Sequence, residues 1–176
     1  RDWPWKFTSE QQFFVKSDRL DYKLSIKNLD SRPMPAGLGL HPFFPEKHLA
    51  RLSCSFQGRW QCDSAGLPSQ FLGLEKSDQF DGSATMNNYD VDHIYTGLNS
   101  DIDLRWDNKK YGVKFENSEE IFGYVVYSPP KHDFFCVEPI THLPNVINMD
   151  EQAGTMNELE PGGSMSICYT FVVSEE

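Results

Sequence analysis

The chain has 176 residues, of which 39% are hydrophobic and 14% aromatic, enough apolar material for the core of one sizeable domain. Its formal net charge is -10, from 26 acidic and 16 basic residues. A chain this acidic offers no basic face to a phosphate backbone, so we do not expect nucleic acid as a partner. No apolar run approaches the roughly 20 residues that cross a bilayer, so we expect no membrane attachment.

The four cysteines are scattered along the chain: Cys54, Cys62, Cys136 and Cys168. They form no CxxC pair and lack the density of a disulfide-stapled secreted domain. The chain opens on Arg1 with no charged-then-apolar leader, so we see no signal peptide. These features predict reduced thiols and a cytoplasmic location.

Strands are predicted along the whole chain by alternating apolar and polar side chains. Leu20, Tyr22, Leu24 and Ile26 share one face of the first strand, as in a half-buried strand. The same alternation returns in four later segments, at residues 52–56, 102–106, 111–115 and 165–173.

Two further segments, 122–127 and 134–137, are apolar on successive residues, which is typical of central strands covered on both faces. No long stretch has helical spacing, and Gly, Pro, Asn and Asp interrupt the chain often. We therefore expect an all-β protein, an antiparallel β-sandwich in which residues 1–176 form one domain.

The first candidate site lies in the segment 34–45, which contains His41 between glycines and prolines. Pro42 favours an extended backbone at His41. Gly37 and Gly39 let the backbone pass close to a ligand or to another strand. A histidine held there can deliver a proton near neutral pH, although a core histidine bonded to a carbonyl would leave the same pattern.

The second candidate is Glu138, which ends the apolar run that begins at Phe134. Buried acids are rare in proteins unless they have a partner or a role. Glu138 could be a general base with a raised pKa, or a structural acceptor for backbone donors or an arginine.

The third candidate is Asp92, which with His93 lies between the apolar residues Val91 and Ile94. Asp92 could bind a pair of hydroxyl groups, or it could cap a turn. Adjacent residues of a strand point to opposite faces, so Asp92 and His93 are not expected to serve one pocket.

Other chemistries lack their sequence patterns. The histidines, at positions 41, 48, 93, 132 and 142, lack the paired spacing of zinc sites, so we predict no metal. No glycine-rich nucleotide motif occurs, and the segment 161–164 precedes a strand, as a turn would. No GxSxG or catalytic-cysteine motif is present. Proton transfer without a cofactor remains the favoured chemistry.

Taken together, four motifs in order make the chain resemble the aldose 1-epimerase (galactose mutarotase) family. They are an alternating strand ending near Asn28, Pro-Ala-Gly-Leu-Gly-Leu-His-Pro-Phe-Phe at 35–44, Val-Asp-His-Ile-Tyr at 91–95, and Val-Glu-Pro at 137–139 with Asn148 ten residues beyond Glu138. A closing Glu-Pro-Gly-Gly turn at 160–163 and the last strand follow. The resemblance runs from about Trp3 to Phe171. It implies a β-supersandwich, and a small free sugar of the glucose or galactose type as the substrate.

The resemblance also implies roles for the matching residues. His41 corresponds to the general acid, Glu138 to the general base, and Asp92 to the acidic residue that hydrogen-bonds sugar hydroxyls. Together they would open the sugar ring and close it as the other anomer, without a metal or cofactor. Phe43, Phe44, Trp60 or Tyr95 could stack on a sugar face, although most phenylalanines are expected in the core.

Members of this family are longer at the N-terminus, where they carry an arginine and a further histidine that contact the sugar. We therefore interpret the chain as a C-terminal portion that lacks N-terminal strands. Three alternatives share parts of the pattern. A hexose 6-phosphate epimerase would need clustered cations, a glycosidase would pair Asp92 with Glu138, and a sugar-binding module would bind without catalysis.

Overall fold

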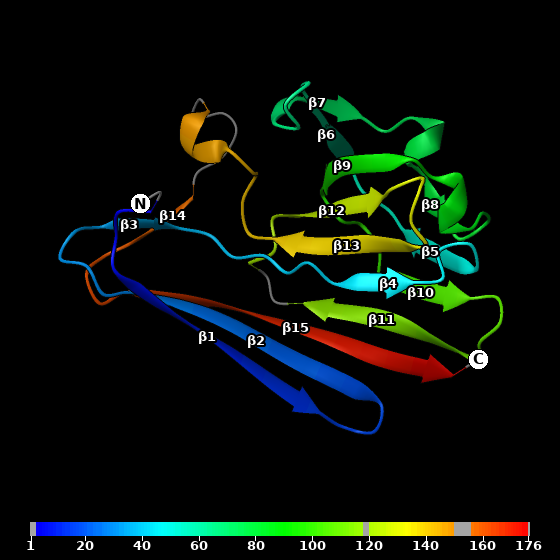
Figure 1. The fold of residues 1–176 in the computed structure, drawn as a ribbon, viewed down its shortest axis with the longest axis horizontal. Helices are drawn as coiled ribbons and strands as arrows, with labels where there is room; N and C mark the ends of the chain where they lie inside the picture. Colours follow the sequence, from blue (N-terminus) through cyan, green and yellow to red (C-terminus); the bar gives the residue numbers. More distant parts are fainter. Residues whose placement is uncertain (1–2, 118–119, 150–155, 176) are drawn as a thin grey trace.

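The computed structural model describes residues 3–117, 120–149 and 156–175, and it is built almost wholly of antiparallel strands (Figure 1). Within these residues there is no α-helix, only three short 3-10 turns: η1 (Lys76–Asp78), η2 (Met86–Asn88) and η3 (Val146–Asn148). None of these elements is long and apolar enough to cross a membrane. The predicted all-β class is confirmed.

The larger sheet has seven strands in the order β1-β2-β15-β11-β10-β5-β8. Their bounds are β1 (Phe7–Val15), β2 (Arg19–Asn28), β15 (Ser164–Glu175), β11 (Tyr111–Asn117), β10 (Ile102–Trp106), β5 (Ala50–Cys54) and β8 (Phe80–Asp81). Every pairing in this sheet is antiparallel. All the strands predicted from alternation lie here.

The second sheet has six strands in the order β4-β13-β12-β9-β6-β7, and a small third sheet pairs β14 with β3. Their bounds are β4 (Phe43–Pro45), β13 (Phe134–Ile140), β12 (Gly123–Ser128), β9 (Val91–Thr96), β6 (Gly58–Cys62), β7 (Pro68–Gly73), β14 (Asn157–Leu159) and β3 (Met34–Ala36). The two apolar segments at 122–127 and 134–137 form β12 and most of β13, next to each other within this sheet.

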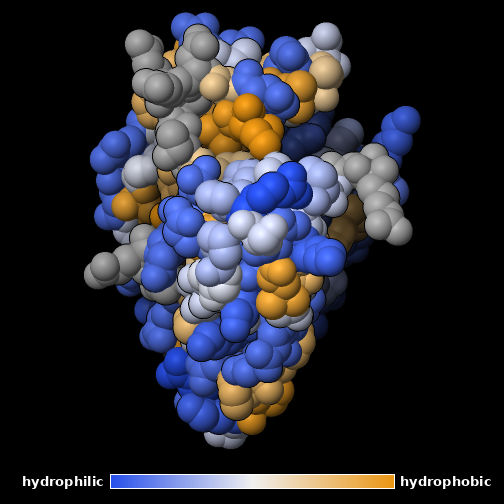
Figure 2. Space-filling view, turned by 90° about the vertical axis from the view of Figure 1, so that its left-hand side faces the viewer, coloured by the Kyte–Doolittle hydropathy of each residue, from blue (hydrophilic) through white to orange (hydrophobic). Residues whose placement is uncertain are grey.

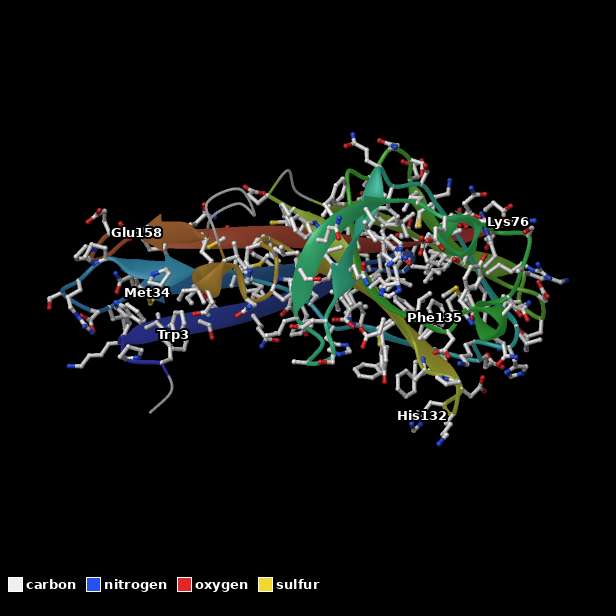
Figure 3. All side chains as sticks on the ribbon, turned by 90° about the horizontal axis from the view of Figure 1, so that it is seen from above. Trp3, Met34, Lys76, His132, Phe135 and Glu158 are labelled. Atoms are coloured by element: carbon white, nitrogen blue, oxygen red, sulfur yellow. The ribbon has the colours of Figure 1, made fainter. Side chains whose placement is uncertain are left out.

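The main core lies between the two large sheets. Leu52, Leu104 and Tyr169 contribute from the seven-stranded sheet, and Tyr95 and Phe135 from the six-stranded sheet, each at most 1% exposed. Figure 3 shows the dense packing of side chains around Phe135. Because side chains alternate along a strand, this packing leaves every second residue of β9, β12 and β13 on the opposite, outer face of the six-stranded sheet.

A small separate cluster covers part of that outer face. Leu143 and Val146, from the segment after β13, pack with Ile94 of β9 and with Val125 of β12. The prediction that β12 and β13 are covered on both faces therefore holds for part of their length. The remainder of the outer face carries the polar side chains described below.

The hairpin of β1 and β2 forms one edge of the larger sheet, away from the six-stranded sheet (Figure 1). Eight of the nine residues of β1 are exposed, among them Phe13 and Phe14 at 59% and 55%. The end of the molecule shown in Figure 2 carries hydrophobic patches separated by hydrophilic surface. An exposed edge strand with large apolar side chains is an open site for association.

A buried ion pair fixes β6 against the turn η1. The Asp78 carboxylate, in a residue only 3% exposed, accepts hydrogen bonds from Arg59 Nε at 2.8 Å and Tyr95 OH at 3.1 Å. It also accepts one from the Glu75 backbone N–H at 2.9 Å. Three donors therefore depend on a single buried acid.

We expect Asp78→Ala to lower the free energy of unfolding by about 3–5 kcal/mol, because it leaves the mostly buried Arg59 with only the exposed Glu75, 3.9 Å away, as an ionic partner. Asp133→Ala is the matched control, since Asp133 pairs with His48 where both side chains are more than half exposed. That control should cost at most about 1 kcal/mol. Urea unfolding measures both changes, and equal losses would contradict this account.

Candidate active site

His41 lies beside Glu138 because the chain before β4 continues the register of β4 with β13. Phe43 is paired with Cys136, and the isolated bridge between Gly39 and Ile140 keeps the same register four residues earlier. Within this register, the residue opposite Glu138 is His41. Two residues nearly a hundred positions apart in sequence are thus cross-strand neighbours, whose Cβ atoms are typically about 5 Å apart.

Backbone hydrogen bonds hold this extension in place. The Leu40 N–H donates to the Pro139 carbonyl at 3.0 Å, and the Thr141 N–H donates to the Leu38 carbonyl at 2.9 Å. Gly39 permits the close approach, since a Cβ there would lie 3.2 Å from Ile140 Cγ2. Of the two uses predicted for this glycine, the structure shows the passage close to another strand.

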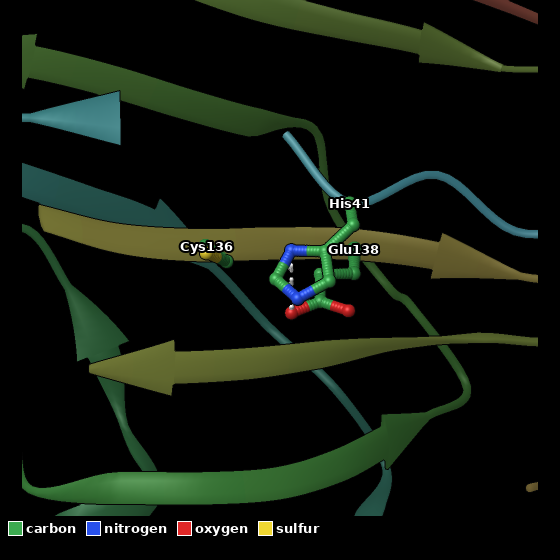
Figure 4. Close-up of side chains that lie close together, drawn as sticks. All are labelled: His41, Cys136 and Glu138. Atoms are coloured by element: carbon green, nitrogen blue, oxygen red, sulfur yellow. Dashed lines mark ion pairs between the residues drawn. The ribbon is translucent and has the colours of Figure 1, made fainter. Parts of the chain in front are cut away.

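The two side chains form an ion pair, with His41 Nδ1 3.3 Å from Glu138 Oε1 (Figure 4). The His41 side chain is 55% exposed, and the Phe43 ring stacks parallel to it at a centroid distance of 4.6 Å. The alternative of a core histidine bonded to a carbonyl is therefore wrong. The imidazole is oriented by Phe43 and Glu138, and it stays open to solvent.

Glu138 has the environment of a proton acceptor that works near neutral pH. Its side chain is 13% exposed, and burial, followed by the charge of Asp92, raises the pKa of Glu138 to about 7. Both effects disfavour the carboxylate form. Among the described residues its ion-pair partner is His41 and not an arginine. At neutral pH this group is thus divided between acid and base forms.

The raised pKa predicts a specific effect on stability. An unfolded glutamate has a pKa near 4.5, so between that value and about 7 the folded chain binds the additional proton. The stability contribution of Glu138 is therefore lost as pH rises through this window. Glu138→Gln should raise the free energy of unfolding by about 1–3 kcal/mol at pH 8, allowing for partial exposure.

At pH 4 the same substitution should have little effect, because the acid and the amide are both neutral. Urea unfolding at the two pH values measures the difference. Glu158→Gln, an exposed residue of β14, is the control and should change stability at neither pH. A destabilised Glu138→Gln at pH 8 would show that the carboxylate is favoured by its surroundings.

Asp92 lies on the same outer face as Glu138. It pairs with Tyr127 of β12, which in turn pairs with Cys136 of β13, and Cys136 precedes Glu138 by two residues. Asp92 is exposed, two strands away from β13. Its charge contributes to the raised pKa of Glu138, which places the two carboxylates within electrostatic reach.

His93 points the other way, as predicted. Its ring lies 6.4 Å from that of Tyr95, whose side chain is fully buried in the core between the sheets. His93 Nδ1 is buried and has no hydrogen-bond partner in the part of the chain that the structure describes. His93 and Asp92 therefore do not serve one site.

The four aromatic residues considered for sugar stacking divide between the two faces. Phe43 is 59% exposed beside His41, and Trp60 pairs with Ile94 on the outer face. Phe44 and Tyr95 are wrong candidates. Phe44 packs on Phe115 and Phe135 in the core. Tyr95 is fully buried, and its hydroxyl is hydrogen-bonded to Asp78. Both side chains point to the inner face of the six-stranded sheet, opposite to the face that carries Glu138.

Cys136 is a member of the site that the sequence did not single out. Its thiol is fully buried, and burial together with Glu138 raises its pKa to about 12. One donor atom of Cys136 lies within 4.8 Å of one from His41 and one from Glu138. The sequence could have indicated Cys136 by its position two residues before Glu138, because side chains two residues apart on a strand lie on the same face.

Two surface hollows lie elsewhere on the molecule. One, of about 400 Å³, lies over β1, β2 and β15, and the other, of about 410 Å³, lies beside β5, η1 and β8. Neither includes His41 or Glu138. His41 and Glu138 lie on the outer face of the six-stranded sheet, where strand register brings them together.

The arrangement places an imidazole beside a carboxyl group of raised pKa on one face of a β-sandwich. Residues 1–171 match the aldose 1-epimerase family, so the chain belongs to this family. Over 162 residues it is 27% identical to the uncharacterized protein YphB of Escherichia coli (strain K12), covering 88% of this chain and 56% of that protein. The chain thus spans little more than half the length of this curated relative.

Solved structures share the fold. A galactose mutarotase-like protein from Clostridium acetobutylicum superposes with a TM-score of 0.86 at 19% identity, over 99% of this chain and 58% of that one. The GalM/aldose epimerase homologue from C. elegans gives a TM-score of 0.80 at 11% identity, over 98% and 61%. The expected galactose mutarotase-like sandwich is confirmed.

Proposed function

We propose that the protein to which this chain belongs is an aldose 1-epimerase, which interconverts the α and β anomers of a free aldohexose. The observation that carries the proposal is the pairing of His41 with Glu138 at 3.3 Å, together with the Glu138 pKa of about 7. Ring opening at neutral pH requires a base that titrates near the working pH, placed beside a group that can donate a proton. Membership in the family supports the same reaction.

In the proposed mechanism, the Glu138 carboxylate removes the proton of the anomeric hydroxyl while protonated His41 donates a proton to the ring oxygen. The bond between the anomeric carbon and the ring oxygen then breaks, leaving an open-chain aldehyde. Rotation about the bond next to the aldehyde carbon presents its other face. Ring closure with the proton transfers reversed gives the other anomer and restores both groups.

The remaining outer-face residues have binding roles in this proposal. Asp92 accepts hydrogen bonds from sugar hydroxyls, since it is an exposed carboxylate on the same sheet face as the base, two strands away. Phe43 offers an exposed ring beside His41, against which the apolar face of a pyranose can stack. A glucose- or galactose-type sugar supplies both the hydroxyls and the apolar ring face.

Charge favours an unphosphorylated sugar over a hexose 6-phosphate. Binding a phosphate dianion generally takes clustered arginines or lysines. Each described arginine is already ion-paired with an aspartate, in the pairs Arg19–Asp21, Arg32–Asp30, Arg51–Asp107, Arg59–Asp78 and Arg105–Asp103. None of these pairs includes a residue of the candidate site.

Cys54, Cys62 and Cys136 are free thiols, which supports a cytoplasmic enzyme in this proposal. Polarimetry of freshly dissolved α-D-glucose and α-D-galactose tests the reaction directly. The protein should shorten the approach to equilibrium rotation for at least one sugar. It should act more weakly on glucose 6-phosphate and release no aglycone from an aryl glycoside. Sugar binding without faster mutarotation would show a binding module instead.

A further inference from the structure

The proposed acid and base lie next to a third side chain of a type that binds transition metals. His41, Cys136 and Glu138 each offer one donor atom, and these three atoms lie within 4.8 Å of one another. Figure 4 shows the His41 ring in front of Glu138, with Cys136 beside them on β13. We propose that they form a binding site for one zinc-class divalent ion, which blocks the site by taking up both proton-transfer groups.

The geometry is close to that of a tetrahedral metal. Zinc binds nitrogen and oxygen at about 2.1 Å and sulfur at about 2.3 Å, so neighbouring donors of a tetrahedral site lie about 3.4–3.7 Å apart. The 3.3 Å between His41 Nδ1 and Glu138 Oε1 already corresponds to one edge. The distances from the Cys136 sulfur to the other two donor atoms are at most 4.8 Å, so they need to shorten by at most about 1 Å to match a tetrahedral site.

The three donor side chains differ in how rigidly the fold holds them. Cys136 and Glu138 are fixed two residues apart on β13, a strand flanked by β4 and β12. His41 precedes β4 and is exposed, so it can adjust to the ion. Three protein ligands leave the fourth tetrahedral position for water, as in open zinc sites.

The chemistry of the donors selects the ion. A thiolate and an imidazole favour zinc, cobalt and similar ions, whereas magnesium and calcium require oxygen ligands. On binding, the Cys136 thiol releases its proton to solvent and a sulfur–metal bond forms, with Glu138 as carboxylate and His41 neutral. No electron is transferred. Because the metal occupies the proposed acid and base, sugar and metal should exclude each other.

The site can be tested without a sugar, so its failure is separate from failure of the proposed function. Co²⁺ is titrated into the metal-free protein, and the near-ultraviolet absorption of a thiolate–cobalt bond is recorded. We expect one Co²⁺ per chain with this absorption, displaced by Zn²⁺ and not by Mg²⁺. Cys136→Ser should remove the absorption and weaken Zn²⁺ binding by on the order of 10²-fold.

Cys168→Ser is the matched control, because Cys168 is exposed on β15 and lies outside the site. It should leave both the absorption and the affinity unchanged. His41→Ala, at an exposed position, should weaken binding as Cys136→Ser does, and it decides the question if circular dichroism shows that Cys136→Ser is unfolded. Unchanged affinity in either folded variant, or loss of the absorption in Cys168→Ser, would overturn the proposal.

Discussion

Glu138→Gln should reduce the enzymatic acceleration of mutarotation by about 10²- to 10⁴-fold, because a correctly placed base typically contributes that much and an amide accepts no proton from a hydroxyl. The amide has nearly the same shape as the carboxyl group, so the register of β4 with β13 should be kept. The loss should appear in kcat, since the proton is transferred in the transition state. Polarimetry at pH 7.5 measures it.

The matched control is Glu158→Gln, an exposed glutamate on the small sheet of β3 and β14, which should keep the normal rate. Circular dichroism checks that both variants retain the β-sheet spectrum. If folded Glu138→Gln still catalyses at a near-normal rate, Glu138 is not the base. Asp92, the other carboxylate on that face, would then be the group to replace.

His41→Asn should lower the rate by a similar factor, about 10²- to 10⁴-fold, because asparagine keeps a hydrogen-bonding side chain but carries no transferable proton. The pH profile of kcat/KM should also change shape. In the unchanged protein, activity falls below about pH 7 as Glu138 takes up its proton, and an alkaline limb is expected from loss of the general acid. Without His41 the alkaline limb should disappear.

His48→Asn is the control for this change. His48 is also exposed and also paired with an acid, Nδ1 lying 2.8 Å from Asp133 Oδ1, but it is outside the site. Its profile should keep both limbs. Because the two site groups lie 3.3 Å apart and interact, the apparent pKa values of the profile belong to the pair. An unchanged two-limbed profile in His41→Asn would exclude this histidine as the acid.

The sequence alone predicted about half of the strands and the candidate residues. Alternation with a period of two predicted β2, β10, β11 and β15, because one face of each must be apolar to meet the core. The same period predicted that Asp92 and His93 face opposite ways. A carboxylate at the end of an apolar run identified Glu138 as unusual, since burial without a partner is costly. The functional roles of these residues, however, came from the resemblance of ordered motifs.

Only the tertiary structure decided which residues meet. His41 faces Glu138 because residues 39–45 pair with residues 134–140, and strand pairing between distant segments is not encoded in a local pattern. The same strand pairings place the side chains of Phe44 and Tyr95 in the core, and they place the Cys136 thiol next to His41 and Glu138. Periodicity gives a residue its face relative to its neighbours in the strand. Which face meets the core, and which strand lies alongside, depends on how the whole chain packs.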